Sequence, residues 1–149
     1  MFCGVEKSMK IIIASDHAGF VLKSEVITHL ESKNIDVVDL GPDTDKNSVD
    51  YPDYAKKVAE QVLAQNCLGI LICGTGIGMS ISANRFKGIR AALVGDTYSA
   101  KMTKRHNNAN IICMGSRVIG TGLAIDIVDT WLSEPFEGGR HQDRLSKIS

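Results

Sequence analysis

Cys73 is the residue whose neighbours in the sequence are best suited to chemistry. It follows the apolar residues 68–72 and precedes the glycine-rich run GTGIG. Glycines let the backbone turn sharply or approach a ligand closely, and the exposed amides at the start of a helix favour an anion. A helix start also favours the thiolate form of a cysteine. We therefore interpret Cys73 as a catalytic base, and Gly74, Gly76 and Gly78 as the loop that holds the oxyanion it generates.

The same segment has simpler explanations. A cysteine that ends an apolar strand is more often a small buried hydrophobe, and the glycines can serve turn geometry alone. The order GxGxG differs from the dinucleotide motif GxGxxG, although Asp96 at a later strand end resembles the acid that binds a ribose. The phosphate-loop pattern GxxxxGK[ST] is absent from the sequence. A small nucleotide-binding module without catalysis stays open as an alternative.

Composition limits the partners that this protein can have. The chain has 149 residues and a formal net charge of zero, which suits one domain and offers no general attraction for nucleic acid or an anionic membrane. No apolar run approaches the roughly 20 residues that a membrane-spanning helix needs, and the start lacks the hydrophobic region of a signal peptide. We predict a soluble protein that binds neither nucleic acid nor membrane.

The four cysteines are Cys3, Cys67, Cys73 and Cys113. Their spacing contains no CxxC pair and no Cys/His metal pattern, and a chain of this size does not need a disulfide framework. We predict free thiols, no metal site and a reducing, cytoplasmic location.

Strand-like and helical patterns alternate along the chain. The apolar runs that predict strands lie at residues 10–15, 35–40, 68–73, 90–94 and 111–114. A helical pattern follows each strand after a short turn, and a polar segment at 140–147 predicts a short terminal helix. Five such alternations predict an α/β fold, a three-layer α/β/α sandwich with a five-stranded, mainly parallel Rossmann-like sheet.

The ends of the chain differ from its middle. Residues 1–8 fit no periodic pattern, so we predict a loose extension in which Cys3 is incidental. Residues 9–149 are predicted to form a single domain. Residues 135–149 are its C-terminal tail, because Pro135, Gly138 and Gly139 interrupt the helical pattern.

Reactive side chains gather in the turns that follow the predicted strands. In parallel sheets ligands bind at the carboxyl ends of the strands. The turns contribute Asp16, His17, Cys73, Gly95, Asp96, Ser116 and Arg117. His106 and Asn107 instead lie at the far end of the fourth helix, which points away from that edge in one chain. A partner subunit that brings its own helix end over the site would solve this problem, so we expect an oligomer.

Several of these residues also have structural explanations. Asp16 could cap the first helix, and Lys101, Lys104 and Arg105 are expected to form a solvated face. Arg140 and Arg144 are one helical turn apart, with His141 beside them. They could belong to a solvated tail or form a phosphate clamp.

Six separated segments resemble one known family in the correct order. They are SDHAG at 15–19, DYPDYA at 50–55, CGTGIGMSISANR at 73–85, RHNNAN at 105–110, GSR at 115–117 and GGRHQDR at 138–144. The chain resembles the RpiB/LacAB sugar-phosphate isomerase family from Met9 to its end. Some members replace the cysteine and use a glutamate just after the glycine loop. Here Cys73 is present, and Met79 and Ser80 follow the loop, so the chain is similar to the cysteine type.

The resemblance implies the interconversion of D-ribose 5-phosphate and D-ribulose 5-phosphate without a metal or cofactor. Cys73 matches the base that moves a proton between the first two sugar carbons, and Thr75 matches a hydroxyl that assists at the sugar oxygens. His106 matches the group that opens the furanose ring, with Asp16 on the other side of the ring. A hexose 6-phosphate isomerase, acting on allose or galactose phosphates, is the alternative within the same chemistry.

The resemblance also implies a set of substrate-binding residues. The residues that match this set are His17, Tyr51, Gly74, Gly76, Gly78, Asn107, Arg117, Arg140 and Arg144. Among them, Asn107 and the loop amides match the groups that hold the enediolate, and His17 and the arginines match the phosphate binders. The family further implies a homodimer, or a dimer of dimers, with active sites shared between subunits.

Overall fold

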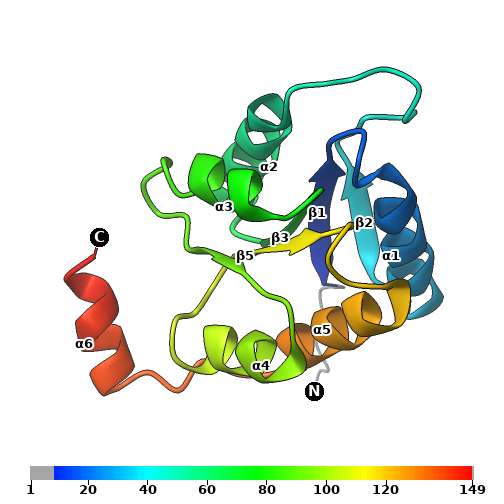
Figure 1. The fold of residues 1–149 in the computed structure, drawn as a ribbon. Coiled ribbons are helices and arrows are strands. Elements are labelled where there is room, and N and C mark those ends of the chain that lie inside the picture. The colour runs from blue at the N-terminus through cyan, green and yellow to red at the C-terminus, as the bar shows by residue number, and fades with distance from the viewer. Residues whose placement is uncertain (1–8, 149) are drawn as a thin grey trace, which may run out of the picture.

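A parallel β-sheet forms the centre of the chain, which a computed structural model describes over residues 9–148 (Figure 1). The predicted extension at 1–8, with Cys3, lies outside the described residues. The strands are β1 Lys10–Ser15, β2 Asp36–Asp39, β3 Leu68–Cys73, β4 Ala91–Leu93 and β5 Ile111–Gly115. They lie in the order β2-β1-β3-β5-β4, and all four pairings are parallel. The prediction of a five-stranded, mainly parallel sheet is confirmed.

Helices cover both faces of this sheet. They are α1 Phe20–Ser32, α2 Tyr51–Gln65, α3 Ile77–Ala83, α4 Thr97–Arg105, α5 Thr121–Ser133 and α6 Arg140–Ser146. Figure 1 shows α1 and α5 on one face, with α4 beside α5, and α2 and α3 on the other face. The predicted three-layer sandwich and short terminal helix are therefore confirmed.

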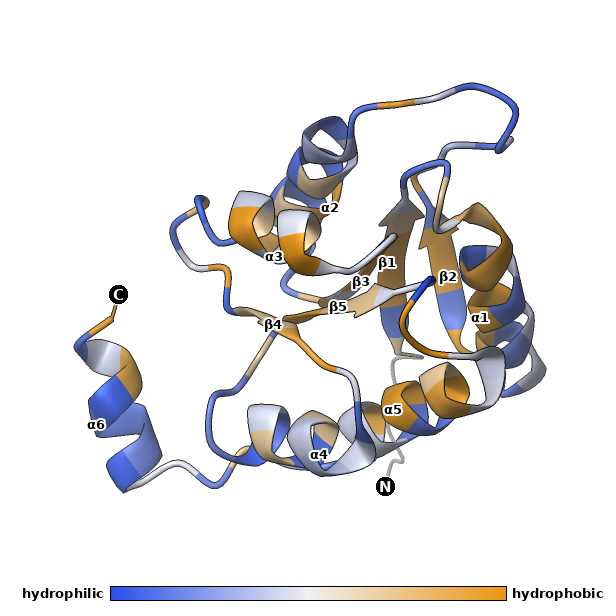
Figure 2. Ribbon diagram, viewed as in Figure 1, coloured by the Kyte–Doolittle hydropathy of each residue, from blue (hydrophilic) through white to orange (hydrophobic). Residues whose placement is uncertain are grey.

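The alternation of side chains along β3 produces two cores. Ile70 and Ile72 pack in the core beneath α1 and α5, whereas Leu71 and Cys73 point into the core beneath α2 and α3. Successive side chains of a strand point to opposite faces, and a strand covered on both faces is apolar throughout. Figure 2 shows this as hydrophobic colour along the central strands, in contrast to the mostly hydrophilic α6.

Capping and turn residues fix where the helices begin. The Asp96 carboxylate accepts a hydrogen bond from the Ser99 amide at 2.6 Å and so caps the start of α4. Such a cap contributes about 1 kcal/mol. At α2, Asp50 is the N-cap residue and Pro52 occupies the first turn, where a missing N–H costs nothing.

Lys23 is a charged residue that the sequence pattern does not single out, yet it is fully buried. Its Nζ lies 2.9 Å from Asp39 Oδ1 and donates to the carbonyl oxygen of Pro42 at 2.6 Å. A buried ammonium needs such partners. The pair ties α1 to the loop that leaves β2 at the carboxyl edge of the sheet.

The predicted solvated face of α4 is only partly correct. Lys104 Nζ donates to the Trp131 carbonyl oxygen at 3.2 Å, and burial lowers the pKa of Lys104. Arg105 Nε lies 2.9 Å from Glu137 Oε2. These two cations therefore join α4 to the end of α5 and to the segment before α6. A helical pattern alone does not predict such contacts, because the partners lie far along the chain.

The direction of the strand order reverses between β1 and β3. From β1 the chain moves to β2 on one side and then to β3 on the other, and such a reversal opens a ligand site at the carboxyl ends of the strands. The turns after β1 and β3 flank this point. Within residues 9–148, no helix combines the length and the apolar character needed to cross a membrane.

Candidate active site

Cys73 ends β3 at the carboxyl edge of the sheet, with 5% of its surface exposed. The Gly76 amide donates a hydrogen bond to Cys73 Sγ at 3.1 Å. Gly76 has φ +81°, and a Cβ there would lie 2.6 Å from Leu93 Cδ1. Only glycine adopts this backbone without strain in so little space. The loop therefore aims a backbone donor at the sulfur.

Thr75 and Tyr51 lie beside the same loop. Thr75 Oγ1 accepts a hydrogen bond from the Ile77 amide at 3.2 Å, at the start of α3. A Cβ on Gly78 would lie 2.5 Å from Tyr51 Cε1, so the phenol ring packs directly against this turn. The start of α2 thus brings Tyr51 to the glycine loop, where a substrate-binding residue would have to lie.

Asp16 and His17 occupy the turn after β1. The Asp16 amide donates to the Ile72 carbonyl oxygen at 3.1 Å, which joins this turn to the end of β3. Asp16 Oδ1 accepts from the Gly19 amide at 3.0 Å, so part of its role is to order the turn before α1. The Val49 amide donates to His17 Nδ1 at 3.1 Å.

Arg117 reaches the glycine loop from the turn after β5. Its amide donates to the Gly74 carbonyl oxygen at 3.0 Å, and a Cβ on Gly74 would lie 3.3 Å from Arg117 Nη1. Ser116 supports the same turn, since its amide donates to the Cys73 carbonyl oxygen at 2.9 Å. Its hydroxyl donates to the Ala18 carbonyl oxygen at 2.8 Å.

These residues form what we call the strand-end cluster. Its members are Asp16, His17, Tyr51, Cys73, Gly74, Thr75, Gly76, Gly78 and Arg117. The structure brings all of them together at one edge of the sheet. They supply a thiol, a carboxylate, an imidazole, a guanidinium and a row of amides, which suits proton transfer on a small anion.

Cys113 shows what a structural thiol is like in this fold. It lies on β5 beside β3 and is fully buried. Burial raises the pKa of the Cys113 thiol far above its ordinary range, and the neighbouring Cys73 raises it further. Cys113 is therefore a neutral core residue at any physiological pH.

The remaining predicted residues lie elsewhere in the chain. We call them, with Glu137 and His141, the α4–α6 cluster: His106, Asn107, Glu137, Arg140, His141 and Arg144. Figure 1 places α6 and the C-terminal end of α4 well away from the turns that follow β1 and β3. The two clusters therefore lie apart within one chain. The sequence led us to expect this separation.

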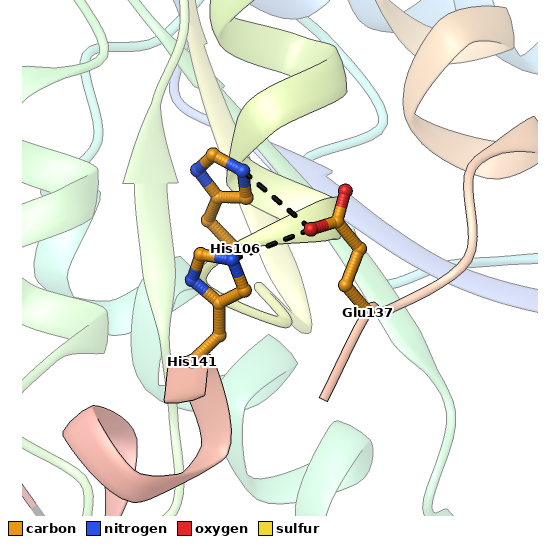
Figure 3. A group of neighbouring side chains, drawn as sticks. All are labelled: His106, Glu137 and His141. Atoms are coloured by element: carbon orange, nitrogen blue, oxygen red, sulfur yellow. Dashed lines mark ion pairs between the residues drawn. The ribbon is translucent and has the colours of Figure 1, made fainter. Parts of the chain in front are cut away.

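Two stacked imidazoles lie at the centre of the α4–α6 cluster. The rings of His106 and His141 are 4.1 Å apart between centroids and 11° from parallel. Both Nε2 atoms face the same oxygen of Glu137, at 3.8 Å from His106 and 3.3 Å from His141 (Figure 3). Burial lowers the pKa of His141, and His106 and Arg140 lower it further, while Glu137 acts in the opposite direction.

These three side chains are also a possible metal-ligand set among residues 9–148, with ligand atoms within 4.8 Å of one another. A shared ion fits poorly, however, because imidazole binds a metal in the plane of its ring. With the planes nearly parallel and stacked, an ion in the plane of one ring would lie far out of the plane of the other. The arrangement suits a carboxylate flanked by two rings better than a metal centre.

Asn107 faces a cavity on the α6 side of the molecule. The cavity has a volume of about 620 Å³ and is lined by the segment around Ile89, by Thr103 and by Leu145 of α6. Sequence reasoning placed Asn107 and the arginines in the site but missed Glu137. No motif marks this residue, and its importance depends on contacts with α4 that only the fold creates.

Comparisons with known proteins identify the family to which this chain is similar. The family described as Ribose/Galactose Isomerase matches residues 11–148. The chain is 47% identical to ribose-5-phosphate isomerase B of Escherichia coli, over 94% of each chain.

Two solved structures are also similar. The ribose 5-phosphate isomerase of Thermotoga maritima has a TM-score of 0.92 at 54% identity, covering 95% of this chain and 98% of the other. Ribose-5-phosphate isomerase B of Mycoplasma genitalium, crystallised with ribulose-5-phosphate, has a TM-score of 0.92 at 47% identity. That match covers 96% of this chain and 95% of the other.

Proposed function

This chain belongs to the Ribose/Galactose Isomerase family, and on that basis we propose that it interconverts D-ribose 5-phosphate and D-ribulose 5-phosphate, with Cys73 as the base. The observation that carries the proposal is the strand-end cluster, in which a loop amide points at the Cys73 sulfur. The similarity to a relative that was crystallised with ribulose-5-phosphate supports the choice of substrate.

The isomerisation needs one base and several fixed donors. The Cys73 thiolate takes the proton from C2 of the open-chain aldose, which gives an enediolate, and the same proton is returned to C1 to give the ketose. The Thr75 hydroxyl assists the exchange of protons on the two sugar oxygens. The Gly76 amide donates to the Cys73 sulfur, and the amides of residues 74–78 with Asn107 stabilise the enediolate.

Two further steps use the remaining residues. His106, with Asp16 on the opposite side of the sugar, opens the furanose ring before the proton transfer. His17 and Arg117 bind the phosphate together with Arg140 and Arg144, which follow each other by one helical turn on α6. Binding energy from the phosphate then orients the reacting carbons at the other end of the sugar.

A homodimer, or a pair of such dimers, would unite the two clusters, because the α4–α6 cluster of one copy could cover the strand-end cluster of the other. Large apolar side chains near the glycine loop support this arrangement. Ile77 is 50% exposed, Ile81 57% and Val118 66%. An interface would remove these groups from water. The cytoplasmic setting inferred from the cysteines is part of the same proposal.

A direct assay tests the proposed function. The purified protein is incubated with ribose 5-phosphate, allose 6-phosphate and galactose 6-phosphate in separate reactions, in heavy water, and the products are followed by NMR. We expect conversion of ribose 5-phosphate to ribulose 5-phosphate, with deuterium at C1 when solvent protons exchange with the thiol. If a hexose 6-phosphate is converted faster than ribose 5-phosphate, the protein is instead a hexose 6-phosphate isomerase. If none of the three sugars is converted, the proposed function is refuted.

A further inference from the structure

Glu137 is held in place from one side and presents its carboxylate to two imidazoles on the other. Its amide donates to the Arg105 carbonyl oxygen at 3.0 Å, and its Oε2 lies 2.9 Å from Arg105 Nε. The other oxygen, Oε1, faces His106 and His141. The carboxylate therefore joins the end of α4 to the start of α6.

The His141 ring stacks against the His106 ring. The His141 side chain is 7% exposed, and its Nε2 has no aligned hydrogen-bond partner among residues 9–148 although it faces Glu137 at 3.3 Å. His106 is 38% exposed, so its ring would be mobile without a support. Stacking against a buried ring and facing a fixed carboxylate limit the orientations that His106 can adopt.

The positive charge that His106 carries during ring opening needs a counter-charge. Opening a furanose requires a group that takes a proton from one sugar oxygen and delivers a proton to the ring oxygen, so His106 becomes an imidazolium during the step. The other charged neighbours in this region are the cations Arg105, Arg140 and Arg144 and a second carboxylate, Glu134, whose Oε1 lies 3.5 Å from Arg105 Nε. Glu137 supplies the opposite charge at 3.8 Å from Nε2.

We propose that Glu137 is a positioning residue for ring opening, which orients His106 and stabilises its imidazolium form, with His141 as the buried platform beneath it. This inference rests on the proposed function, since it assigns His106 to a cyclic sugar phosphate. It concerns the ring-opening step alone and leaves the proton transfer at Cys73 unaffected.

The two substrates separate these steps. Ribose 5-phosphate is mainly a furanose, whereas ribulose 5-phosphate is an open chain, because its C5 oxygen carries the phosphate and cannot close a furanose. An enzyme that fails to open the ring must wait for aldehyde that forms in solution. With Glu137→Gln, the initial rate from ribose 5-phosphate should therefore reach a plateau as enzyme concentration rises, set by uncatalysed ring opening. The initial rate from ribulose 5-phosphate should stay proportional to enzyme.

We expect Glu137→Gln to lower kcat for ribose 5-phosphate by about 10- to 100-fold. Glu137→Asp, which keeps the charge, should recover part of this loss. In a His106→Asn background, Glu137→Gln should cause no further loss, because the positioned ring is already absent. Glu134→Gln is the matched control, since Glu134 Oε1 lies 3.5 Å from Arg105 Nε but is not part of the imidazole cluster.

Three results would overturn the inference. In the first, Glu137→Gln keeps the wild-type kcat, and its rates stay proportional to enzyme concentration with both sugars. In the second, Glu137→Gln loses the same fraction of its rate with both sugars. In the third, the control Glu134→Gln shows the same plateau with ribose 5-phosphate. The last two would indicate a general displacement of α6 or a role of Arg105. A wild-type protein that interconverts neither sugar would refute the proposed function itself, and the inference with it, before any variant is compared.

Discussion

The strand-end cluster and the α4–α6 cluster are held together by different kinds of contact. At the strand ends, backbone amides bond to Ile72, Cys73 and Gly74, and close packing around Gly76 leaves no room for a side chain. In the α4–α6 cluster, side-chain charge pairs and one ring stack join the ends of two helices. The sheet therefore fixes the strand-end cluster rigidly, whereas the α4–α6 cluster depends on charge and, in our proposal, on another copy.

The largest expected effect is at the cysteine of the strand-end cluster. Cys73→Ala should lower kcat by about 10³-fold with little change in KM, because it removes the base but not the phosphate contacts. Steady-state kinetics on both pentose phosphates would measure this. Cys113→Ala is the control, and it should lower the melting temperature while turnover persists. A Cys73→Ala variant with near-normal kcat would refute the assignment.

Mixing two variants, each deficient in the turnover of ribose 5-phosphate, tests whether the clusters work across a subunit boundary when that sugar is the substrate. Cys73→Ala and His106→Asn chains are coexpressed or refolded together, so that half of the dimers carry one of each. In such a dimer one site holds both changes and the other holds none, so about a quarter of wild-type activity should return. Each variant alone is the control. If activity does not return although the chains exchange, as native mass spectrometry would verify, the shared site is wrong.

A smaller effect is expected at the phosphate end of the α4–α6 cluster. Arg144→Ala should raise KM about tenfold or more with a modest change in kcat, because a guanidinium contact to the phosphate is lost. Arg140→Ala should behave similarly. Lys147→Ala removes the same charge from the end of the same helix and should leave KM unchanged. An unaltered KM in both arginine variants would exclude the clamp.

The smallest expected effect concerns the loss of folding stability as the pH falls. Because its surroundings lower the pKa of His141, the folded chain binds fewer protons there than the unfolded chain. The resulting stability is complete above the ordinary histidine pKa of about 6.5 and declines as the pH falls below it. The melting temperature of the wild type should thus decrease more between pH 7.5 and pH 5.5 than that of His141→Gln. Equal decreases in the two proteins would contradict this source of acid sensitivity.

Much of the fold follows from local patterns in the sequence. Apolar β-branched runs mark the strands because a strand covered on both faces has no place for polar groups, and Asp96 marks the start of α4 through its cap. The turns that follow β1, β3 and β5 then gather Asp16, Cys73 and Arg117 by topology alone. The strand-end cluster was predictable for this reason.

The contacts of α6 were not predictable in the same way. Glu137, His141 and Arg105 come together only after α4, α5 and α6 have docked, and no periodicity specifies that docking. Lys23 is a similar case, since its burial depends on the Pro42 carbonyl oxygen and Asp39 across a loop. The division into an extension and a single domain, and the roles of the site residues, stay predictions.

The hydrogen bond from the Val49 amide determines the tautomer of His17. Because an N–H donates to Nδ1, that nitrogen holds a lone pair, and the neutral ring carries its hydrogen on Nε2. In the proposed site the His17 Nε2–H then offers the phosphate a donor in a fixed direction. His17 would therefore discriminate by the geometry of the ligand, and Arg117, Arg140 and Arg144 by its charge.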